Sequence, residues 1–550
     1  MNPAWPQPLD PLHSAAGSAI AASLPLVIVL VLMGGLRKSG LFASLCGLAT
    51  AVALALTIWR MPAILILWSG IYGAVYALWP ILWIVFTALW LYNLTQDTGK
   101  FDLLRRWIEQ HASGDPAVQV LLVAFCFGAL LEGTAGFGAP VAMTAFLLVS
   151  LGHPARRAVL TALIANTAPV AFGSLGIPIL ALAGVTGLPL NQLSAMAGRQ
   201  VPVLSLLLPA YLVLVVSGPA GLRKRWPIAL VTGLSFSLTQ FIVSNFSGPY
   251  LADVLAACVS IIATVAFLKL RPSKEVGSMA HGNAVAHGGS RGLQEKHGAS
   301  APENRPLTPG ESFAAWFSWL LLSAVVILWT WLKLIPTAQQ LVPIPNLHNG
   351  VLLTLYHKPY AALYTFQPFA AGTAALVATI LTALCLRVSG KTFLHSGLTT
   401  FRQLRIPGLT VIAIVALAYL YNYSGMAYTL GATFARVGPA FPLLSGFLGW
   451  VACFLSGSDT ASNLLFGNLQ VAAAHQLHLS PILLAATNSS GAVAGKMVSP
   501  QNIAVGVTTV GLIGQEGKVL RSAFWHSILL AAVISLIAFA QAYWLTWMIP

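Results

Sequence analysis

Long runs of apolar residues alternate with short polar segments along almost the whole chain. Apolar runs of about 18 residues or more are long enough to cross the hydrocarbon core of a bilayer as helices. The pattern leaves open whether the run 61–95, which contains Trp79-Pro80, is one span or two elements. It predicts twelve crossings, at residues 18–36, 41–59, 61–95, 158–188, 192–217, 227–246, 249–268, 312–334, 366–388, 406–424, 480–514 and 522–548.

Two further apolar regions, 117–152 and 439–478, are interrupted halfway by small polar residues. The first contains LLEGTAGFGAP, residues 130–140, which places an acid and three glycines deep in apolar sequence. Backbone that is not helical is tolerated at membrane depth only where protein buries it or where it lines a wet cavity. We therefore expect two re-entrant hairpins with glycine tips. The alternative is that these glycines allow close helix packing, but Glu132 and Pro140 favour a tip.

The amino-acid composition narrows the class of protein. The chain is 57% hydrophobic and only 7% charged, and its mean hydropathy is +0.81. A soluble domain carries about 25% charged residues, so we expect an all-α polytopic membrane protein. The net charge of +15 fits basic cytoplasmic loops and not a nucleic-acid partner.

Basic residues set the predicted orientation. With the N-terminus outside, most of the 28 Lys and Arg fall in inner loops, as the positive-inside rule requires. Both termini are then extracytoplasmic. The predicted parts are a tail (1–17), a first transmembrane half (18–270), a flexible Gly- and His-rich cytoplasmic linker (271–311) and a second transmembrane half (312–550).

The two halves contain a repeat. NTAPVAFGSLGIP and NSSGAVAGKMVSP share an Asn, a Gly and a Pro at identical spacing, which are Asn166, Gly173 and Pro178 in the first and Asn488, Gly495 and Pro500 in the second. Upstream of each lies a glycine followed by a hydroxyl residue, Gly133-Thr134 and Gly457-Ser458. In the predicted topology the two copies run in opposite directions. Inverted repeats with broken helices, here at 158–188 and 480–514, are typical of secondary transporters.

Lys496 is the main candidate for substrate binding, because a lysine near the bilayer centre is costly and marks function by default. Ser499-Pro500 predicts the N-terminus of a half-helix, whose dipole favours an anion. The surrounding polar residues and the matching positions of the first repeat complete the predicted substrate site: Asn488, Ser489, Ser490, Gln501, Asn502, Asn166, Thr167, Gly133, Thr134 and Ser458.

Two acids, Glu132 and Asp459, lie deepest in apolar sequence and are the candidates for proton coupling, with Glu132 preferred. Lys496 also suits a structural pair with either acid, and the two roles are compatible. Arg199 lies about two turns into a span, where it can grip a carboxylate or extend to the interface. Gln240 lies inside a span, and Asp253 is expected to be solvated at its outer edge.

The chain contains no HExxH zinc motif and no Walker A loop, so we expect neither an enzyme nor a direct ATP drive, and no cofactor or metal. The irregular spacing of His281, His287 and His297 in the linker does not predict a metal site.

The sequences LLEGTAGFGAPVAM, LIANTAPVAFGSLGIPI, AGRQVP, SNFSGP, SGSDTASNLLFGNLQ and GKMVSPQNIAVG closely resemble the bacterial L-lactate permease family, from about residue 20 to the C-terminus. The resemblance implies a multi-pass protein of the bacterial plasma membrane that moves lactate, and often glycolate, with protons.

Two rival functions remain open at this point: a sodium-coupled di- or tricarboxylate symporter, for which Ser458, Asp459 and Thr460 would supply oxygen ligands, and a membrane sensor that binds without transport. The expected partners are a small carboxylate, protons and the lipid bilayer, and a homo-oligomer is compatible with the sequence.

Overall fold

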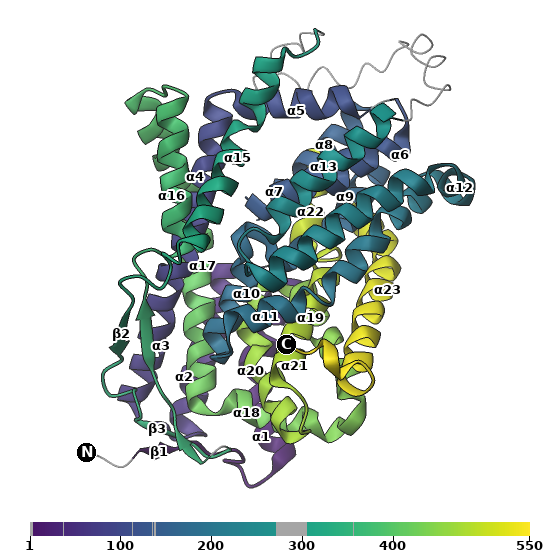
Figure 1. Cartoon of the computed structure of the whole chain (residues 1–550). Helices are drawn as coiled ribbons and strands as arrows, with labels where there is room; N and C mark the ends of the chain where they lie inside the picture. The colour runs from purple at the N-terminus through teal and green to yellow at the C-terminus, as the bar shows by residue number, and fades with distance from the viewer. Residues whose placement is uncertain are drawn as a thin grey trace.

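The structure, a computed structural model, describes residues 4–36, 38–112, 114–134, 136, 139–270, 305–355 and 357–550. The linker histidines therefore lie outside the described residues, as does Gly138. Helices dominate the fold (Figure 1), as the apolar pattern predicts. The helices before residue 271 are α1 (Ala15–Leu30), α2 (Gly40–Thr57), α3 (Ala63–Tyr76), α4 (Trp83–Asp97), α5 (Lys100–His111), α6 (Pro116–Gln119), α7 (Gly128–Thr134), α8 (Ala139–Ser150), α9 (Ala155–Ala165), α10 (Gly173–Thr186), α11 (Leu190–Ala197), α12 (Val201–Phe246) and α13 (Ala252–Leu270).

The second half contains fewer helices among its described residues. They are α15 (Pro309–Trp331), α16 (Ala371–Cys385), α17 (Gly390–Ser424), α18 (Met426–Phe434), α19 (Phe441–Ser456), α20 (Asp459–Gln476), α21 (Pro481–Lys496), α22 (Pro500–Thr509) and α23 (Glu516–Tyr543). Several begin at Ser or Thr side chains that accept hydrogen bonds from the first helical turn, as Ser39, Ser389 and Ser480 do. Local sequence thus sets these starts.

The described residues contain ten helices that are long and apolar enough to cross a membrane, or eleven if the bent pair α9–α10 counts as one span. Large apolar side chains such as Leu24, Leu67 and Leu238 are exposed on them, which suits contact with lipid. The protein is therefore a multi-pass membrane protein. The total of twelve crossings stays a prediction, because these lengths include hairpin limbs and omit the short α16.

Each of the two regions predicted as hairpins contains a pair of helices, and their re-entrant arrangement stays a prediction. In Figure 1, α7 and α8 lie in the upper half, whereas α19 and α20 lie in the lower half. Gly218 (φ 70°) breaks α12 into two segments. The two segments pack against each other, and Ser205 Oγ of the first donates to Gln240 Oε1 of the second at 2.9 Å. In the run 61–95, α3 and α4 are joined by the π-helical segment Ala77–Leu82, where only Trp79 is non-helical.

α19 and α21 lie in backbone contact. A Cβ atom added to Gly491 would clash with the Gly446 carbonyl, and one added to Gly449 would clash with the Asn488 carbonyl. Gly495 meets the Trp450 carbonyl in the same way. Small residues at such spacing let membrane helices approach closely, so the second hairpin and the following helix form one compact unit.

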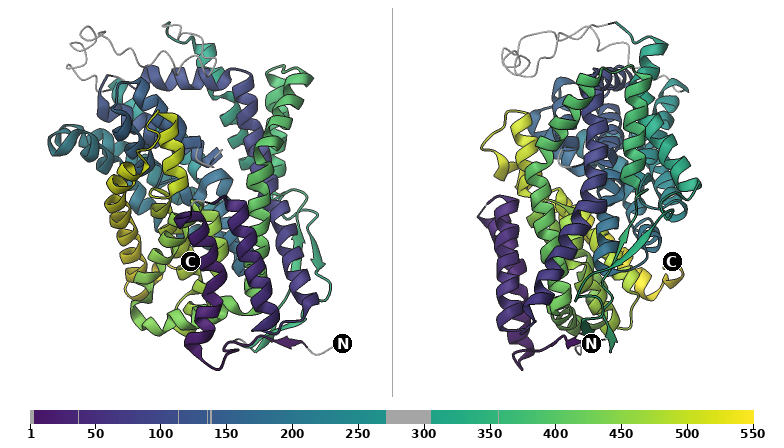
Figure 2. Two further views of the ribbon diagram at one scale, coloured as in Figure 1. Left: turned by 180° about the vertical axis from the view of Figure 1, so that it is seen from behind. Right: turned by 90° about the vertical axis from the view of Figure 1, so that its left-hand side faces the viewer.

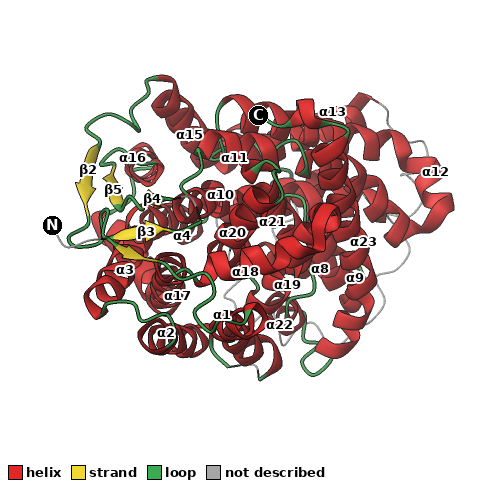
Figure 3. Cartoon of the chain, turned by 90° about the horizontal axis from the view of Figure 1, so that it is seen from below, coloured by secondary structure: helices red, strands yellow, loops and turns green. Residues whose placement is uncertain are grey.

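Two small sheets at the lower end were not expected from the apolar pattern (Figure 3). The first joins β1 (Trp5–Pro6), β3 (Val351–Leu353) and β4 (Lys358–Pro359), with β1 parallel to β3 in the register Trp5↔Val351. The second is the antiparallel pair β2 (Gln340–Pro343) and β5 (Leu363–Phe366). Residues of the predicted N-terminal tail are thus held against a loop of the second half, and Gln7 also donates to the carbonyls of Asn422 and Tyr423.

Candidate functional site

The first helix break follows Asn166, at the end of α9. The axis bends by 63° between α9 and α10. The chain then passes through Ser174 (φ 46°, ψ 54°), Leu175 (φ 58°, ψ 41°) and Gly176 (φ 77°, ψ 18°), all left-handed. This conformation costs a residue with a side chain roughly 1–2 kcal/mol, and strain of this kind gathers at functional sites.

The second break separates α21 from α22 and follows the prediction from Ser499-Pro500. Ser499 caps α22 by accepting from the Asn502 amide at 3.3 Å. The Asn502 side chain donates to Ser499 Oγ at 2.8 Å and to the carbonyls of Gly457 and Lys496 at 3.3 Å each. Asn502 therefore fastens the tip of the second hairpin to the break.

A buried ion pair joins the two halves between these breaks. Lys496 Nζ lies 2.5 Å from Glu132 Oε1, and the two side chains are 9% and 4% exposed. The other oxygen, Glu132 Oε2, accepts from Asn166 Nδ2 at 2.9 Å. A buried charge is retained only where it is paired and hydrogen-bonded, and both requirements are met here. The predicted pairing of Lys496 with Glu132 is thus present.

Asp459 differs from Glu132 in its partners. It begins α20 just after the cap Ser458, and its Oδ2 accepts from Ser489 Oγ at 2.8 Å. Its Oδ1 is buried and has no hydrogen-bond partner, and no salt bridge to Asp459 exists among the described residues. Asp459 is therefore a buried acid with spare hydrogen-bonding capacity.

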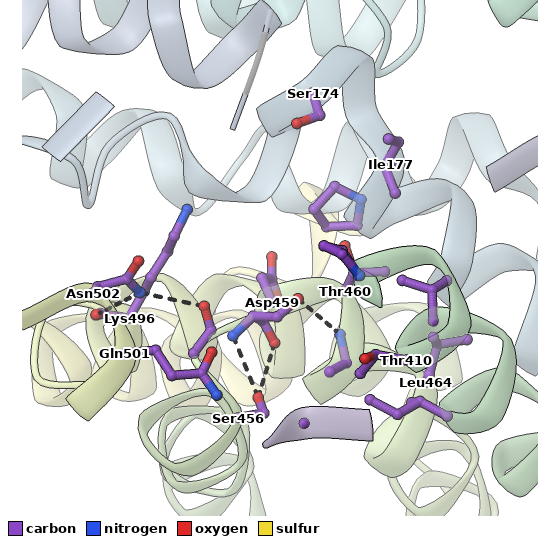
Figure 4. A pocket seen from close by; sticks show the side chains of 18 of the residues that line it. Ser174, Ile177, Thr410, Ser456, Asp459, Thr460, Leu464, Lys496, Gln501 and Asn502 are labelled. Carbon is purple, nitrogen blue, oxygen red and sulfur yellow. Dashed lines mark hydrogen bonds between the residues drawn. The ribbon is translucent and has the colours of Figure 1, made fainter. Parts of the chain in front are cut away.

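A cavity of about 520 Å³ lies beside these groups (Figure 4). Glu132, Lys496, Asp459 and both helix breaks line one wall, and α17 lines another with Ile406–Ile414. The cavity extends to Lys38 and Ser39, which are exposed in the connection between α1 and α2. A neighbouring space of about 280 Å³ continues past Gln501 to Glu516 and Gly517. The cavity therefore connects the ion pair with one surface of the molecule.

On its far side, α10 is tied to the helices around it. Tyr76 and Tyr419 donate to the carbonyls of Leu180 and Gly184, at 3.1 Å each. The side-chain amides of Asn422 and Asn468 both donate to the Val185 carbonyl, at 3.2 and 2.7 Å. These bonds occupy carbonyls in the last turns of α10 and fasten this helix to its neighbours. Figure 2 shows the purple helices near the N-terminus beside green helices of the second half, in agreement with the packing of α2 and α3 against α17.

The structure brings only part of the predicted substrate site to the cavity. Of the predicted residues, those that line it are Glu132, Ser458, Asp459, Lys496, Gln501 and Asn502. Those that do not line it are Gly133, Thr134, Asn166, Thr167, Arg199, Asn488, Ser489 and Ser490.

The predicted residues that do not line the cavity contact other parts of the structure. Asn488 is fully buried and donates to Asn463 Oδ1 at 3.0 Å, within the second half. Gly133 packs against Asp253 and Val254 of α13, so the packing interpretation suits this glycine, whereas Gly136 (φ 54°) makes the turn. Arg199 binds Asn245 Oδ1 at 2.8 Å and the Met548 carbonyl at 2.7 Å, away from the cavity.

The remaining members are buried hydroxyl and amide groups. Thr134 Oγ1 donates to the Leu130 carbonyl at 2.7 Å within its own helix. Thr167 Oγ1 and Ser490 Oγ are buried and have no hydrogen-bond partner. Asn166 and Ser489 reach the cavity only indirectly, through their bonds to Glu132 and Asp459.

Two features of the site were missed or misplaced from sequence. Ser174 lines the cavity but resembles any serine in an apolar run. Asp253 was expected to be solvated, and that expectation is wrong: it is fully buried, and its Oδ1 accepts from Gln240 Nε2 at 2.9 Å. The loop and helix that cover Asp253 come from tertiary packing, which apolar periodicity does not report.

Among the described residues, no group of three or more His, Cys, Asp or Glu side chains is arranged to hold a metal ion. The chemistry that this arrangement offers is charge recognition: the buried Lys496 and two buried acids, with the exposed Lys38 at the mouth, face a space large enough for a small organic anion.

Comparison with known proteins identifies the family. Residues 18–545 match the family model described as L-lactate permease. The glycolate permease of Escherichia coli (strain K12) is 40% identical over 564 residues, which cover 99% of this chain and 99% of the relative. The L-lactate permease of Bacillus subtilis (strain 168) is 40% identical over 574 residues, covering 99% and 100%.

Among solved structures, the YdaH transporter of Alcanivorax borkumensis is 16% identical and covers 83% of this chain and 84% of that one, with a TM-score of 0.42. That likeness is too weak to carry any inference. The sequence matches span nearly the whole chain, and this protein therefore belongs to the L-lactate permease family.

Proposed function

We propose that this protein is a secondary transporter, and not an enzyme, that carries lactate and related small 2-hydroxy monocarboxylates such as glycolate together with protons. The names of the relatives, L-lactate permease and glycolate permease, support the substrate class. The observation that carries the proposal is the buried pair of Lys496 and Glu132 on the wall of an open cavity.

Lys496 is the group that binds the substrate carboxylate. It ends α21, and the N-terminus of α22 begins four residues later beside the same cavity. An ammonium group and a helix N-terminus both attract an anion. Without substrate, the Lys496 ammonium group is paired with the Glu132 carboxylate. An incoming substrate carboxylate therefore competes with Glu132 for the ammonium group.

This competition couples the substrate to a proton. The pair of Lys496 and Glu132 holds one ammonium and one carboxylate, so the charges of the pair cancel. With a substrate anion added, the charge of the site is unchanged only if one of its acids takes up a proton, and Glu132 is the first candidate. Anion without proton leaves one excess negative charge, and proton without anion leaves one excess positive charge.

The half-loaded states are disfavoured because a buried charge without a partner costs about 3–5 kcal/mol. Each 1.4 kcal/mol is a factor of ten, so such states are suppressed by at least about a hundredfold when the site is enclosed. One substrate anion then crosses with one proton, and the step carries no net charge. Asp459, which lies on the same wall, is the second candidate for the proton.

We also propose that the cavity faces the cytoplasm. In Figure 1, α5 with Arg105 and Arg106, and the end of α13 with Lys269, lie at the upper end. Basic residues concentrate on the cytoplasmic side, so the upper end is inside and both termini are outside. The cavity mouth at Lys38 and Glu516 lies on the cytoplasmic side in this orientation.

Uptake into proteoliposomes tests the function. An outside-acid pH gradient in sodium-free buffer is expected to drive accumulation of labelled lactate, with unlabelled glycolate competing. Collapse of the pH gradient should abolish accumulation, whereas an imposed membrane potential alone should not drive it. A strict requirement for sodium would reject proton coupling, and binding without any accumulation would reject transport.

A further inference from the structure

Ser174 presents a hydroxyl group to the cavity that no other part of the described chain uses. It lines the same cavity as Lys496, and its hydroxyl group makes no hydrogen bond with the side chains or backbone of the described residues. Two of the other polar side chains on the cavity wall are already engaged: Ser458 caps α20, and the Asn502 amide donates to three oxygen atoms. A free hydroxyl group on a cavity wall is a ready hydrogen-bonding partner for a ligand.

The backbone holds Ser174 in place. Ser174 and the next two residues are left-handed, and the turn is packed on both sides. Leu175 is fully buried, and a Cβ atom added to Gly176 would lie 2.8 Å from the Pro249 carbonyl oxygen. The hydroxyl group is therefore positioned before any ligand arrives, and such positioning lowers the entropic cost of binding.

The internal repeat relates Ser174 to the cation. Ser174 directly follows Gly173, as Lys496 directly follows Gly495, and these glycines are matched in the two repeats. At these matched positions, the first half presents a hydroxyl group to the cavity and the second half presents an ammonium group. Figure 4 shows both side chains reaching the cavity from different ribbons.

Two glycines bring Ser174 close to the ion pair. A Cβ atom added to Gly136 would clash with Ser174 Oγ and would lie 3.7 Å from Glu132 Oε1. A Cβ atom added to Gly173 would lie 2.8 Å from the same Glu132 oxygen, which binds Lys496. A molecule seated on Lys496 therefore has the Ser174 hydroxyl group as a near neighbour.

We propose that Ser174 hydrogen-bonds the 2-hydroxyl group of the substrate and makes the transporter select 2-hydroxy acids over their unsubstituted analogues. This rests on the proposed function: Lys496 takes the carboxylate, and Ser174 takes the adjacent hydroxyl group. A substrate without that group leaves the serine unpaired in a closed site, which disfavours the analogue.

The test compares matched substrates in matched variants. Labelled lactate and propionate differ at carbon 2 only by the hydroxyl group, as do glycolate and acetate. For Ser174→Ala, kcat/KM for the 2-hydroxy acids is expected to fall between about twofold and tenfold, while kcat/KM for propionate and acetate does not fall, because the variant leaves no unpaired serine beside them. The selectivity ratio therefore falls by at least that factor.

Two further variants separate this role from a structural one. Ser174→Gly also removes the hydroxyl group but suits the left-handed backbone, so it carries the test if the alanine variant fails to fold. Ser174→Asn tolerates that backbone and restores a hydrogen-bonding group, so selectivity should partly return. Equal losses for both substrates of a pair, or an unchanged ratio in the alanine and glycine variants, would overturn the proposal. Failure of wild-type protein to transport any of these acids would instead reject the proposed function.

Discussion

Replacement of Glu132 by Gln is the most direct probe of the coupling. The change keeps the shape of the side chain and an oxygen atom for Asn166, but it removes the negative charge that lies 2.5 Å from Lys496 Nζ. In the empty variant the buried ammonium group has no counter-charge. A bound substrate anion supplies one, so the variant should hold its substrate tightly.

The magnitude follows from the cost of an unpaired buried charge. Removing one partner of such a pair costs about 3–5 kcal/mol, and an anion that restores the balance recovers it. A gain of about 3 kcal/mol corresponds to a dissociation constant about a hundredfold lower. On the proposed coupling of one proton to each anion, the dissociation constant of wild-type protein should rise about tenfold per pH unit. In Glu132→Gln that slope should be close to zero.

Binding of labelled lactate to purified protein at several pH values measures both effects. In proteoliposomes the variant should exchange labelled for unlabelled lactate but should not accumulate it under a pH gradient. Glu109→Gln is the matched control, because Glu109 belongs to the amphipathic α5, outside the cavity, and contacts Arg105 at 3.7 Å. Accumulation driven by the pH gradient in Glu132→Gln would refute the reasoning, as would a dissociation constant that depends on pH as steeply as in wild-type protein. Asp459 would then be the candidate for the proton-carrying residue.

Three further predictions test other parts of the structure. Lys496→Ala should lower lactate affinity at least about a hundredfold in the same binding assay, and unchanged affinity would exclude Lys496 as the anion site. Gly491→Ala should lower the free energy of unfolding by about 1–3 kcal/mol, because its Cβ atom would meet the backbone of α19. Thermal melts should show no loss for Gly70→Ala, since nothing lies within 4 Å of a Cβ atom there. Burial and the nearby Arg157 lower the pKa of His153 from its ordinary 6.5. The unfolded chain therefore takes up a proton at this histidine more readily than the folded protein, and the protein loses stability as the pH falls below 6.5. His153→Gln should flatten this decline in melts recorded between about pH 5 and pH 8.

The sequence predicted the breaks in the helices better than the contacts across them. Asn166, Gly173 and Ser499-Pro500 interrupt apolar runs, and local chemistry alone fixes a cap or a turn there. The partnership of Lys496 and Glu132 was also foreseeable, because a lone charge in apolar sequence needs a counter-charge.

Contacts between distant segments were beyond such reasoning. Asn488 matches Asn166 in the repeat, yet Asn166 bonds to the acid Glu132 and Asn488 bonds to Asn463. The residue before the matched glycine is Glu132 in the first hairpin but a serine in the second, so Asn488 has no equivalent acid to bind. Ser174 gave no signal, since a left-handed turn at a serine and a leucine contradicts their usual preferences. The burial of Asp253 depends on segments that fold over it, as does the pairing of β1 with β3.

The backbone contact between α19 and α21, together with the hydrogen bonds that fasten Asn502 to the hairpin tip and the helix break, affects how the substrate is carried. With glycines at the interface there are few flexible side chains to absorb a shift, so a displacement of the second hairpin takes the lysine along with it. The substrate would then travel with Lys496 as its companion. With that contact kept on the whole path, the attraction for the carboxylate would be similar at both membrane faces.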